Sequence, residues 1–453
     1  MIQDPRHIAL KVLLDWHRGS LTLDKSLEIH SEEISNLQKN DRSLCNAIVF
    51  GVLRKRETID WVIRSFSYTT LEKMDIISLY ILRMALFQIL HMDRIPTFAA
   101  IHNAVDISKA LSGRKTAGFI NAVLRKASEN HNTLSLPNEK TEPDKFLSVK
   151  HSFPIWLSKK WIKAFGIDHT KKLCQQIDSI PQITICCNLL KTSRHSLSEA
   201  LYLCTKNIQT TDYASHGICF SNPMLPVQEL EAFKLGLFHV QDEAAQIVTE
   251  YLGPEPGEII LDTCAGYGGK VFHIAQLMDN QGIVIASDID PEKLETLQLD
   301  AKRLGIDIIQ IKTIDILKSS IKDFDFYFDR VLIDAPCTGL GVLQRNPDTK
   351  WKRSKKDIER LSTKQKKMIN SAANLVKPGG ILVYAVCSCE KEENEDVIFS
   401  FLNKRKDFSI DKDFHSDKYS LFITNEGFFK TYPDPKNMDG FFAARLIRKS
   451  KIN

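Results

Sequence analysis

The chain has 453 residues, of which 43% are hydrophobic and 26% charged, which is ordinary for a globular protein of about two to four domains. Its formal net charge of +5 permits a polyanionic partner without requiring one. The N-terminus lacks the layout of a signal peptide, and no apolar run reaches membrane-spanning length. Ten cysteines are scattered without the spacing of a disulfide framework or a zinc motif. We therefore expect a cytoplasmic protein with reduced thiols, no membrane contact and no metal.

The first 130 residues are expected to form an all-helical domain. Apolar side chains recur there at the helical period, as at Ile8, Val12 and Leu13. The stretch 79–90 is strongly apolar and has few turn-forming residues, which is typical of a helix buried in a bundle. We predict a helical bundle over residues 1–130.

The pattern changes after this bundle. Residues 131–150 are polar, with Asn, Thr, Glu, Lys and Pro, and are interpreted as a linker. Residues 151–238 then alternate between helix and strand signals, with a helix over Trp156–Phe165 and a strand over Ile183–Leu190. A unit of this size lies below the usual domain size, so we expect it to pack on the domain C-terminal to it.

From residue 239 to residue 449, short apolar runs alternate with segments of helical period, which predicts a doubly wound, Rossmann-like α/β domain. The predicted strands are Ile259–Leu261, Ile283–Ala286, Ile308–Ile311, Val331–Ile333, Ile381–Ala385 and Phe441–Ile447. Such sheets bind ligands at the carboxyl ends of their strands. The polar residues expected there are Asp262, Cys264, Asp288, Asp315, Asp334, Cys337 and Cys387. Because these polar residues all follow predicted strands, we expect them to form a single site.

A glycine-rich loop comes after the first of these strands. Glycines let a backbone approach a ligand closely, and the next helix offers unpaired N–H groups. The loop is not a P-loop, because Cys264 replaces the first glycine and Val271 replaces the serine or threonine. It also lacks the third glycine of a dinucleotide fingerprint. Asp288 at the tip of the second strand suits a ribose diol. The alternative is a loop that only caps a helix.

A set of residues spread over the helical region forms a recognisable pattern. It consists of Arg6, Ala9 and Leu13; Asp41-Arg42; Gly51 to Arg54; Leu82 to Gln88; Arg94 to Pro96 with Ala99; and Asn121 to Arg125. With these residues the region resembles the NusB family, whose members are compact helical bundles that bind RNA in antitermination. The resemblance implies that residues 1–130 bind RNA, and the alternative is a bundle that only packs on its neighbour.

Two further stretches decide the reaction. One runs from Asp334-Ala-Pro-Cys337 to Asn346-Pro-Asp-x-Lys-Trp351, and the other is Val386-Cys-Ser-Cys389. With the glycine loop and Asp439-Gly-Phe-Phe442, they resemble the RNA cytosine-5 methyltransferase family, and within it the branch with a NusB-like domain that acts on 16S ribosomal RNA. The resemblance implies S-adenosylmethionine as cofactor, a small α+β RNA-binding extension at 151–238 and a methyltransferase domain at 239–449. The expected protein is a monomer whose substrate is free 16S rRNA or an early assembly intermediate.

The family resemblance also implies catalytic roles. Carbon 5 of cytosine is a poor nucleophile until a thiolate adds to C6. By resemblance, Cys387 is this nucleophile and Cys337 serves product release, while Lys270 favours the thiolate and Asp334 hydrogen-bonds the base. DNA cytosine-5 enzymes instead use a Pro-Cys cysteine, which would favour Cys337. Cys389 is a third candidate, because residues two apart in an extended strand face the same side.

Cofactor contacts are carried over in the same way. They map to Cys264, Ala265, Gly266, Tyr267, Gly268, Gly269, Lys270, Asp288, Asp315 and Asp334. Asp288 would hold the ribose and Asp315 would lie near the adenine amino group. Two positions depart from the family: Gly266-Tyr267 replaces Ala-Pro, which makes the loop less rigid, and Val386 replaces a threonine.

Several alternatives stay open. A basic run from Arg345 to Lys367 that includes Trp351 suits a phosphate-contacting edge or, equally, a solvated helix face. An amino-group methyltransferase would need Asp/Asn-Pro-Pro-Tyr/Phe in place of Asp334 to Cys337. A catalytically inactive RNA-binding or antitermination factor would not need the intact cysteines and Lys270. Within the favoured interpretation, the target is a specific cytosine of 16S rRNA, and another cytosine or another RNA is the alternative.

Overall fold

The structure, a computed structural model, describes residues 4–19, 21–412, 414, 417–434 and 438–450. The chain forms two compact units, and they are not separated at a single point. The first unit comprises residues 1–179 together with 346–352, and the second comprises residues 180–345 and 353–453. No helix among the described residues is long and apolar enough to cross a membrane.

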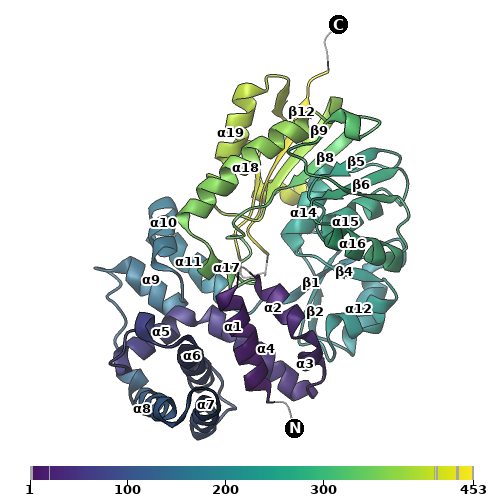
Figure 1. The fold of residues 1–453 in the computed structure, drawn as a ribbon. Helices are drawn as coiled ribbons and strands as arrows, with labels where there is room; N and C mark the ends of the chain where they lie inside the picture. Colours follow the sequence, from purple (N-terminus) through teal and green to yellow (C-terminus); the bar gives the residue numbers. More distant parts are fainter. Residues whose placement is uncertain (1–3, 20, 413, 415–416, 435–437, 451–453) are drawn as a thin grey trace. The chain divides into compact units, whose positions relative to one another are not determined.

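The regular elements of the first unit's described residues are all helices, as predicted for residues 1–130 (Figure 1). Residues 131–150, expected to be a linker, contain helix α9, and its Phe146 and Leu147 are buried because this helix packs on α5 and α10. The helices are α1 (Pro5–Arg18), α2 (Leu23–Ile29), α3 (Ser31–Ser35), α4 (Lys39–Arg54), α5 (Arg56–Phe66), α6 (Ile76–His91), α7 (Thr97–Ser112), α8 (Arg114–Asn130), α9 (Pro143–His151), α10 (Ile155–Phe165), α11 (Ile167–Ile177) and α17 (Thr349–Lys352).

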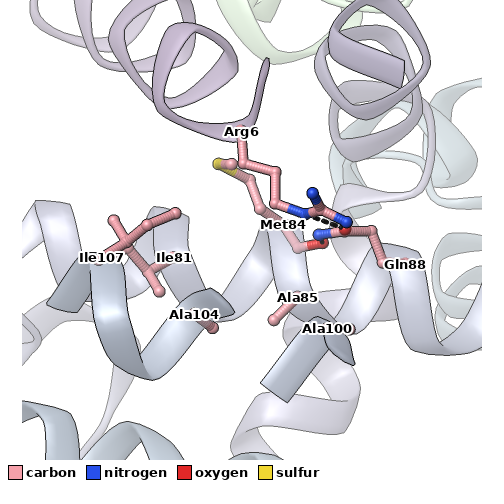
Figure 2. A pocket seen from close by; sticks show the side chains of 8 residues that line it. All are labelled: Arg6, Ile81, Met84, Ala85, Gln88, Ala100, Ala104 and Ile107. Atoms are coloured by element: carbon pink, nitrogen blue, oxygen red, sulfur yellow. Dashed lines mark hydrogen bonds between the residues drawn. The ribbon is translucent and has the colours of Figure 1, made fainter. Parts of the chain in front are cut away.

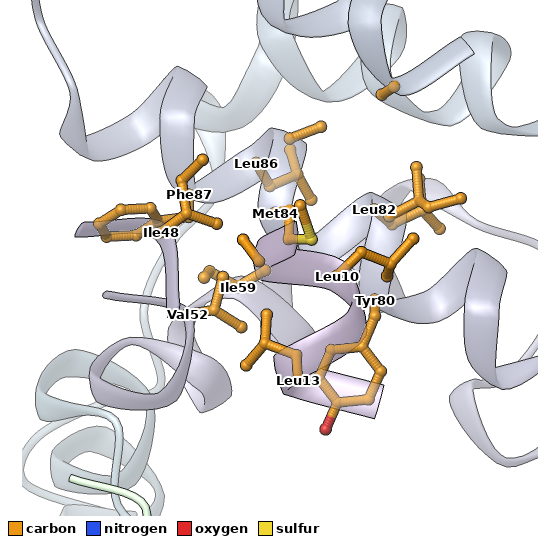
Figure 3. Close-up of a cluster of buried hydrophobic side chains, with 14 of the residues drawn as sticks. Leu10, Leu13, Ile48, Val52, Ile59, Tyr80, Leu82, Met84, Leu86 and Phe87 are labelled. Atoms are coloured by element: carbon orange, nitrogen blue, oxygen red, sulfur yellow. The ribbon is translucent and has the colours of Figure 1, made fainter. Parts of the chain in front are cut away.

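The core of this unit gathers around α6, whose residues from Ser78 to Gln88 are all buried (Figure 3). A helix that is apolar on every side belongs at the centre of a bundle, which explains the apolar stretch of the sequence. Helix α4 approaches α6 closely at Gly51. A Cβ at that position would lie 1.9 Å from the ring of Phe87, so only glycine fits there.

Two arginines of the NusB-like pattern serve the fold of the first unit. Arg6 of α1 donates to the Gln88 side chain of α6 at 2.8 Å beside a small apolar pocket (Figure 2). Arg54 is buried and donates to the carbonyl oxygens of Ile177 and Ser179. Their place in the pattern therefore has a structural explanation.

Segment 346–352 belongs to the helical unit by its contacts. The Trp351 indole N–H donates to the Leu53 carbonyl at 2.6 Å. The Lys350 side chain is 1% exposed, and its Nζ donates to the Arg54 carbonyl at 3.1 Å and lies 4.5 Å from the centre of the Phe153 ring. Asn-Pro-Asp-x-Lys-Trp is therefore a packing motif of the first unit.

The second unit begins with a small sheet of antiparallel pairs, in the order β2-β3-β1-β4, packed with short helices. This confirms a small α+β part, although residues 151–179 of the predicted range 151–238 belong to the helical unit. The predicted strand 183–190 ends at Cys187, because Asn188 turns the chain and bonds to Gly236 and Leu304 instead. The elements are β1 (Ile183–Cys187), α12 (Arg194–Tyr202), β2 (Lys206–Thr210), β3 (Gly217–Ser221), α13 (Glu231–Lys234) and β4 (Phe238–Val240).

The rest of the second unit is the predicted Rossmann-like domain (Figure 1). Its sheet has the order β10-β12-β9-β8-β5-β6-β7, with β11 paired to β12. The strands from β9 to β7 are parallel, and β12 runs antiparallel between β9 and β10. All six predicted strands are present, and the short β10 and β11 were not predicted. The strands are β5 (Ile259–Asp262), β6 (Ile283–Asp288), β7 (Ile309–Thr313), β8 (Phe328–Asp334), β9 (Val376–Val386), β10 (Phe408–Ile410), β11 (Phe429–Lys430) and β12 (Phe442–Arg448), with helices α14 (Glu243–Leu252), α15 (Gly269–Leu277), α16 (Pro291–Leu304), α18 (Lys355–Ala373) and α19 (Glu395–Lys404).

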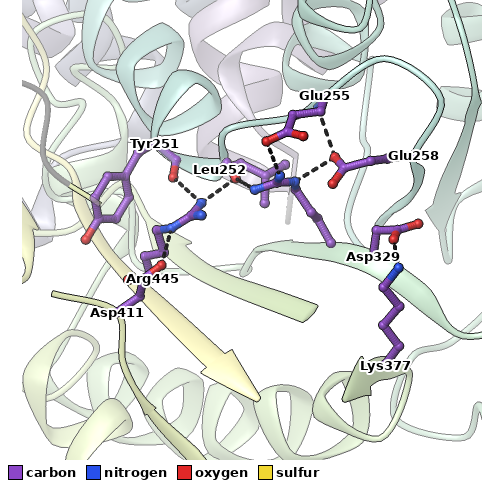
Figure 4. Close-up of polar contacts among 9 residues, drawn as sticks. Tyr251, Leu252, Glu255, Glu258, Asp329, Lys377, Asp411 and Arg445 are labelled. Carbon is purple, nitrogen blue, oxygen red and sulfur yellow. Dashed lines mark hydrogen bonds and ion pairs between the residues drawn. The ribbon is translucent and has the colours of Figure 1, made fainter. Parts of the chain in front are cut away.

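Two buried arginines fix the C-terminal end of α14 beside this sheet (Figure 4). Arg330 of β8 and Arg445 of β12 both donate to the Leu252 carbonyl oxygen. Arg330 also donates to Glu258 at 2.6 Å and Arg445 to Asp411 at 2.8 Å. Each buried charge therefore has a carboxylate partner, as burial of an ion requires.

Candidate active site

Strands β5 and β8 are parallel neighbours at the centre of the sheet, and β5 has β6 on one side and β8 on the other. This is the topological switch point, where doubly wound sheets bind ligands. Asp262, Asp288 and Asp334 are the last residues of these three strands. The prediction that polar residues gather at one edge of the sheet is confirmed for them.

The glycine loop passes over this edge. Gly266 donates its N–H to Asp288 Oδ2 at 2.9 Å, and Gly266 and Gly268 have φ angles of +53° and +92°. No heavy atom lies within 4 Å of where a Cβ would stand on Gly266 or Gly269, so the loop leaves open space beside its backbone. Helix α15 begins at Gly269 and points its first N–H groups toward the same edge. Tyr267, where the family has proline, is 62% exposed.

Lys270 and Asp334 form an ion pair beneath the loop. Lys270 Nζ donates to Asp334 Oδ2 at 2.6 Å; Lys270 is buried, whereas Asp334 is partly exposed. Burial alone would lower the pKa of Lys270, but the adjacent Asp334 carboxylate outweighs it and raises this pKa. Lys270 therefore keeps its positive charge. The sequence did not predict that Asp334 would be its partner.

Asp262 lies at the bottom of the site and is fully buried. It accepts the Cys264 N–H at 3.0 Å. Burial raises the pKa of Asp262 to about 7. Asp315, expected near the cofactor, comes after β7, and its side chain accepts the Leu317 N–H at 3.0 Å. Strand β7 is the neighbour of β6, which ends at Asp288, so Asp315 lies at the same edge of the sheet.

The two candidate cysteines meet at this edge. Cys337 Sγ and Cys387 Sγ are 3.2 Å apart, and both residues are partly exposed. The hydrogen bond with Cys387, burial and the nearby charge of Glu393 raise the pKa of Cys337. Cys389 is different: it is 3% exposed, packs on Gly440, and its pKa is raised by burial. The structure thus brings two of the three candidate thiols together.

Glu393 holds both cysteine loops, and the sequence did not single out this role. Its carboxylate accepts the Thr338 N–H at 2.9 Å, the Thr338 hydroxyl, the Ser388 hydroxyl at 2.6 Å and the Gln365 amide at 3.0 Å. The residue is fully buried. It lies in the run Glu390 to Asp396, whose charges resemble a solvated surface, so only the cysteine spacing could have drawn attention to it.

The basic run after Cys337 separates into two parts. Arg345 is tied to Asp242 and Asp439 at 2.7 and 2.9 Å, and Arg353 donates to the Thr338 carbonyl. With the buried Lys350, they serve the fold. The exposed basic side chains of α18 are Lys355, Lys356, Arg360, Lys364 and Lys367, and Glu359 is exposed among them. Only this second part suits a phosphate backbone.

The sheet order, the glycine loop at the switch point and the paired thiols define a Rossmann-like enzyme of the methyltransferase class. Family models match in three consecutive parts: NusB over residues 3–129, the RsmF/B-like ferredoxin-like domain over 153–228, and 16S rRNA methyltransferase RsmB/F over 249–447. The chain belongs to the ribosomal RNA small subunit methyltransferase B family.

The similarity to individual relatives extends over nearly the whole chain. The probable ribosomal RNA small subunit methyltransferase B of Synechocystis sp. is 32% identical over 97% of this chain and 98% of its own length. The probable enzyme of the same name from Bacillus subtilis is 32% identical over 98% of both chains. The crystal structure of PH0851 is similar with a TM-score of 0.82 and 26% identity, covering 98% of this chain and 99% of that chain.

Proposed function

We propose that this protein transfers a methyl group from S-adenosylmethionine to C5 of a cytosine in 16S ribosomal RNA, of the cytosine 967 type, through a covalent adduct between a cysteine and C6. The observation that carries the proposal is the pair of partly exposed thiols, 3.2 Å apart, beside the glycine loop. An amino-group methyltransferase has no use for two thiols at this place. Neither has a factor that only binds RNA.

The surroundings of the two thiols favour Cys387 as nucleophile. Cys387 interacts with the charge of Lys270, whereas Cys337 faces the carboxylate of Glu393. A positive charge stabilises a thiolate and a negative charge opposes it. The contact with Cys387, burial and the Glu393 charge all raise the pKa of Cys337, so a thiolate at Cys337 is disfavoured.

The chain's residues then have consistent roles. The Cys387 thiolate adds to C6, and the electron pair of the C5–C6 bond becomes available at C5, which takes the methyl group. Asp334 hydrogen-bonds the base and stabilises charge on the ring. Removal of the C5 proton by a base restores the double bond and expels the Cys387 thiolate, and Cys337 lies close enough to assist this release. The target base must be unpaired or flipped out.

The residues at the strand ends fit the proposed cofactor. S-adenosylmethionine supplies the methyl group when it is bound. The open space at Gly266 and Gly269 admits a ligand against the backbone, and the partly exposed Asp288 at the tip of β6 suits a ribose diol. We assign the cofactor site to the loop 264–270 with Asp288, Asp315 and Asp334. RNA contacts are assigned to the extension and to the exposed basic side chains of α18.

Methyl transfer from labelled S-adenosylmethionine to unmodified small-subunit ribosomal RNA tests the proposal. Wild type should form 5-methylcytosine, Cys387→Ala should be inactive, and Cys337→Ala should accumulate a covalent protein–RNA adduct. Cys204→Ser, a thiol of the extension, is the matched control and should behave as wild type. The reverse pattern would exchange the two cysteine roles. Cofactor binding without transfer to 16S rRNA would indicate another RNA, and absence of cofactor binding would favour an RNA-binding factor.

A further inference from the structure

Three buried side chains from distant parts of the second unit converge away from the strand ends. Cys186 lies on β1, His216 directly precedes β3, and His273 lies on α15. One ligand atom from each residue lies within 4.8 Å of the others, and all three side chains are buried. None of them takes part in the proposed methyl transfer.

The two imidazoles are aimed at each other. His273 Nε2 and His216 Nδ1 are 3.0 Å apart, and the ring centres are 4.9 Å apart. Both rings are buried, and the neutral imidazole is the form that binds metal. The second nitrogen of His273, Nδ1, is buried without a hydrogen-bond partner among the described residues. The histidine pair is thus an incompletely satisfied polar group in the protein interior.

We propose that Cys186, His216 and His273 bind one divalent, thiophilic metal ion of the zinc type. Thiolate and imidazole are the ligands that zinc prefers, and three protein ligands are the number found in sites that keep one exchangeable position. Zinc–nitrogen and zinc–sulfur bonds of about 2.0 and 2.3 Å place tetrahedral ligand atoms roughly 3.3 to 3.6 Å apart. The observed cluster, within 4.8 Å, reaches this geometry by shifts of about 1 Å.

The charges around the cluster suit a metal ion. On binding, the Cys186 thiol releases its proton to solvent, and a divalent ion with one thiolate leaves a net charge of +1. Glu250 of α14 interacts electrostatically with both Cys186 and His216, and it accepts the Ser215 N–H at 2.7 Å. A carboxylate at this place balances the buried charge. Arg194 and Lys418, whose charges also act on His216, are not buried, so water screens them more strongly.

The sequence predicted no metal because no two of these residues form a recognisable motif. Because the three ligands come from separate elements, an ion bound by them would also link these elements. It would join the extension, through β1 and the turn before β3, to the helix that begins at the glycine loop. His273 is one helical turn beyond Lys270, so the ion would fix α15 against the sheet of the extension.

Metal content of the full chain tests this inference. The protein is purified in the presence of Zn²⁺, desalted and analysed by elemental mass spectrometry, and Co²⁺ is used as a spectroscopic probe. We expect about one ion per chain, a thiolate-to-cobalt absorption band, and a melting temperature that rises by several degrees with Zn²⁺. Cys186→Ser and His273→Gln should lose all three signals.

Two variants control for the loss of a buried thiol or imidazole. Cys219→Ser on β3 and His239→Gln on β4 lie outside the cluster and should keep the metal. Wild-type protein that binds neither Zn²⁺ nor Co²⁺ stoichiometrically would overturn the proposal without reference to any variant. So would binding that survives Cys186→Ser and His273→Gln, because the ion would then lie elsewhere.

Discussion

Cys337 and Cys387 stand 50 positions apart in the chain, yet their sulfur atoms are 3.2 Å from each other. Each residue comes after a different parallel strand, β8 or β9, and the two strands are neighbours in the sheet. Backbone contacts extend the junction, since Gly341 donates to the Cys387 carbonyl and Gly440 to the Gly341 carbonyl. The two thiols are therefore adjacent because β8 and β9 are neighbours in the sheet. One carboxylate accepts hydrogen bonds from the loops that follow both strands.

That carboxylate, Glu393, is expected to act as a positioning residue. Glu393→Ala leaves the buried Thr338 N–H without an acceptor and removes one acceptor from the Ser388 hydroxyl and the Gln365 amide, which should cost roughly 3 kcal/mol of stability. Methyl transfer should fall through kcat with little change in KM, because the thiols lose their relative placement.

The variant Glu393→Gln separates the effect of Glu393 on the placement of the thiols from its effect on the stability of the protein. It keeps the shape and one acceptor oxygen, and hydroxyl groups can rotate to accept from its amide. We expect it to recover most of the stability and part of kcat, as measured by thermal melting and steady-state kinetics. Full activity in Glu393→Ala would show that the two loops hold themselves together.

Lys270→Met tests the charge beside the nucleophile. The raised pKa of Lys270 keeps its ammonium charged throughout the neutral range, so its removal should slow alkylation of Cys387 by iodoacetamide at pH 7 by about tenfold. Mass spectrometry of the modified peptide isolates Cys387 from the other thiols. Lys293→Met, a lysine near the loop that lies over Tyr267, is the control and should leave the rate unchanged. Equal rates in all three proteins would contradict a role for Lys270 in thiol activation.

Lys350 should make stability depend on pH. Burial lowers its pKa to about 7, far below the usual value of 10.5 that it regains on unfolding. Between these values the unfolded chain binds more protons, so the free energy of unfolding should rise with pH from about 7 to 10.5, by up to ~1.4 kcal/mol per pH unit. Lys350→Met should flatten this dependence, whereas the exposed Lys355→Met should keep it. Chemical denaturation at several pH values provides the comparison.

Gly51→Ala should destabilise the helical unit. The new methyl group would overlap the Phe87 ring, and forced repacking of this kind typically costs about 1–3 kcal/mol. Gly118→Ala, in α8, is the matched change because nothing lies within 4 Å of its added Cβ. It should stabilise the same unit slightly through helix propensity, by at most ~1 kcal/mol. Similar melting temperatures for the two variants would mean that α4 and α6 separate easily.

The sequence predicted the helices and strands that are marked by a periodic pattern of apolar residues within a short stretch of chain. The six main strands, the all-helical first unit and the convergence of Asp262, Asp288 and Asp334 result from periodicity and from the rule of strand ends. It did not reveal Asp334 as the partner of Lys270, because the two residues are 64 positions apart in the chain. It did not reveal the role of Glu393 either, because a glutamate within a charged run is ordinarily expected to be exposed. It also assigned Lys350 and Trp351 to a possible RNA-binding edge, although both are packed in the helical unit.

The segment 346–352 makes the helical unit discontinuous along the chain. No single peptide cut can release it whole, because a fragment ending at residue 179 lacks the Trp351 and Lys350 side chains that bond to Leu53 and Arg54. If the helical unit unfolds, segment 346–352, which follows the Cys337 loop, also loses its contacts with Leu53 and Arg54. The helical unit thus depends for its stability on segment 346–352, which follows the loop of Cys337 in the chain.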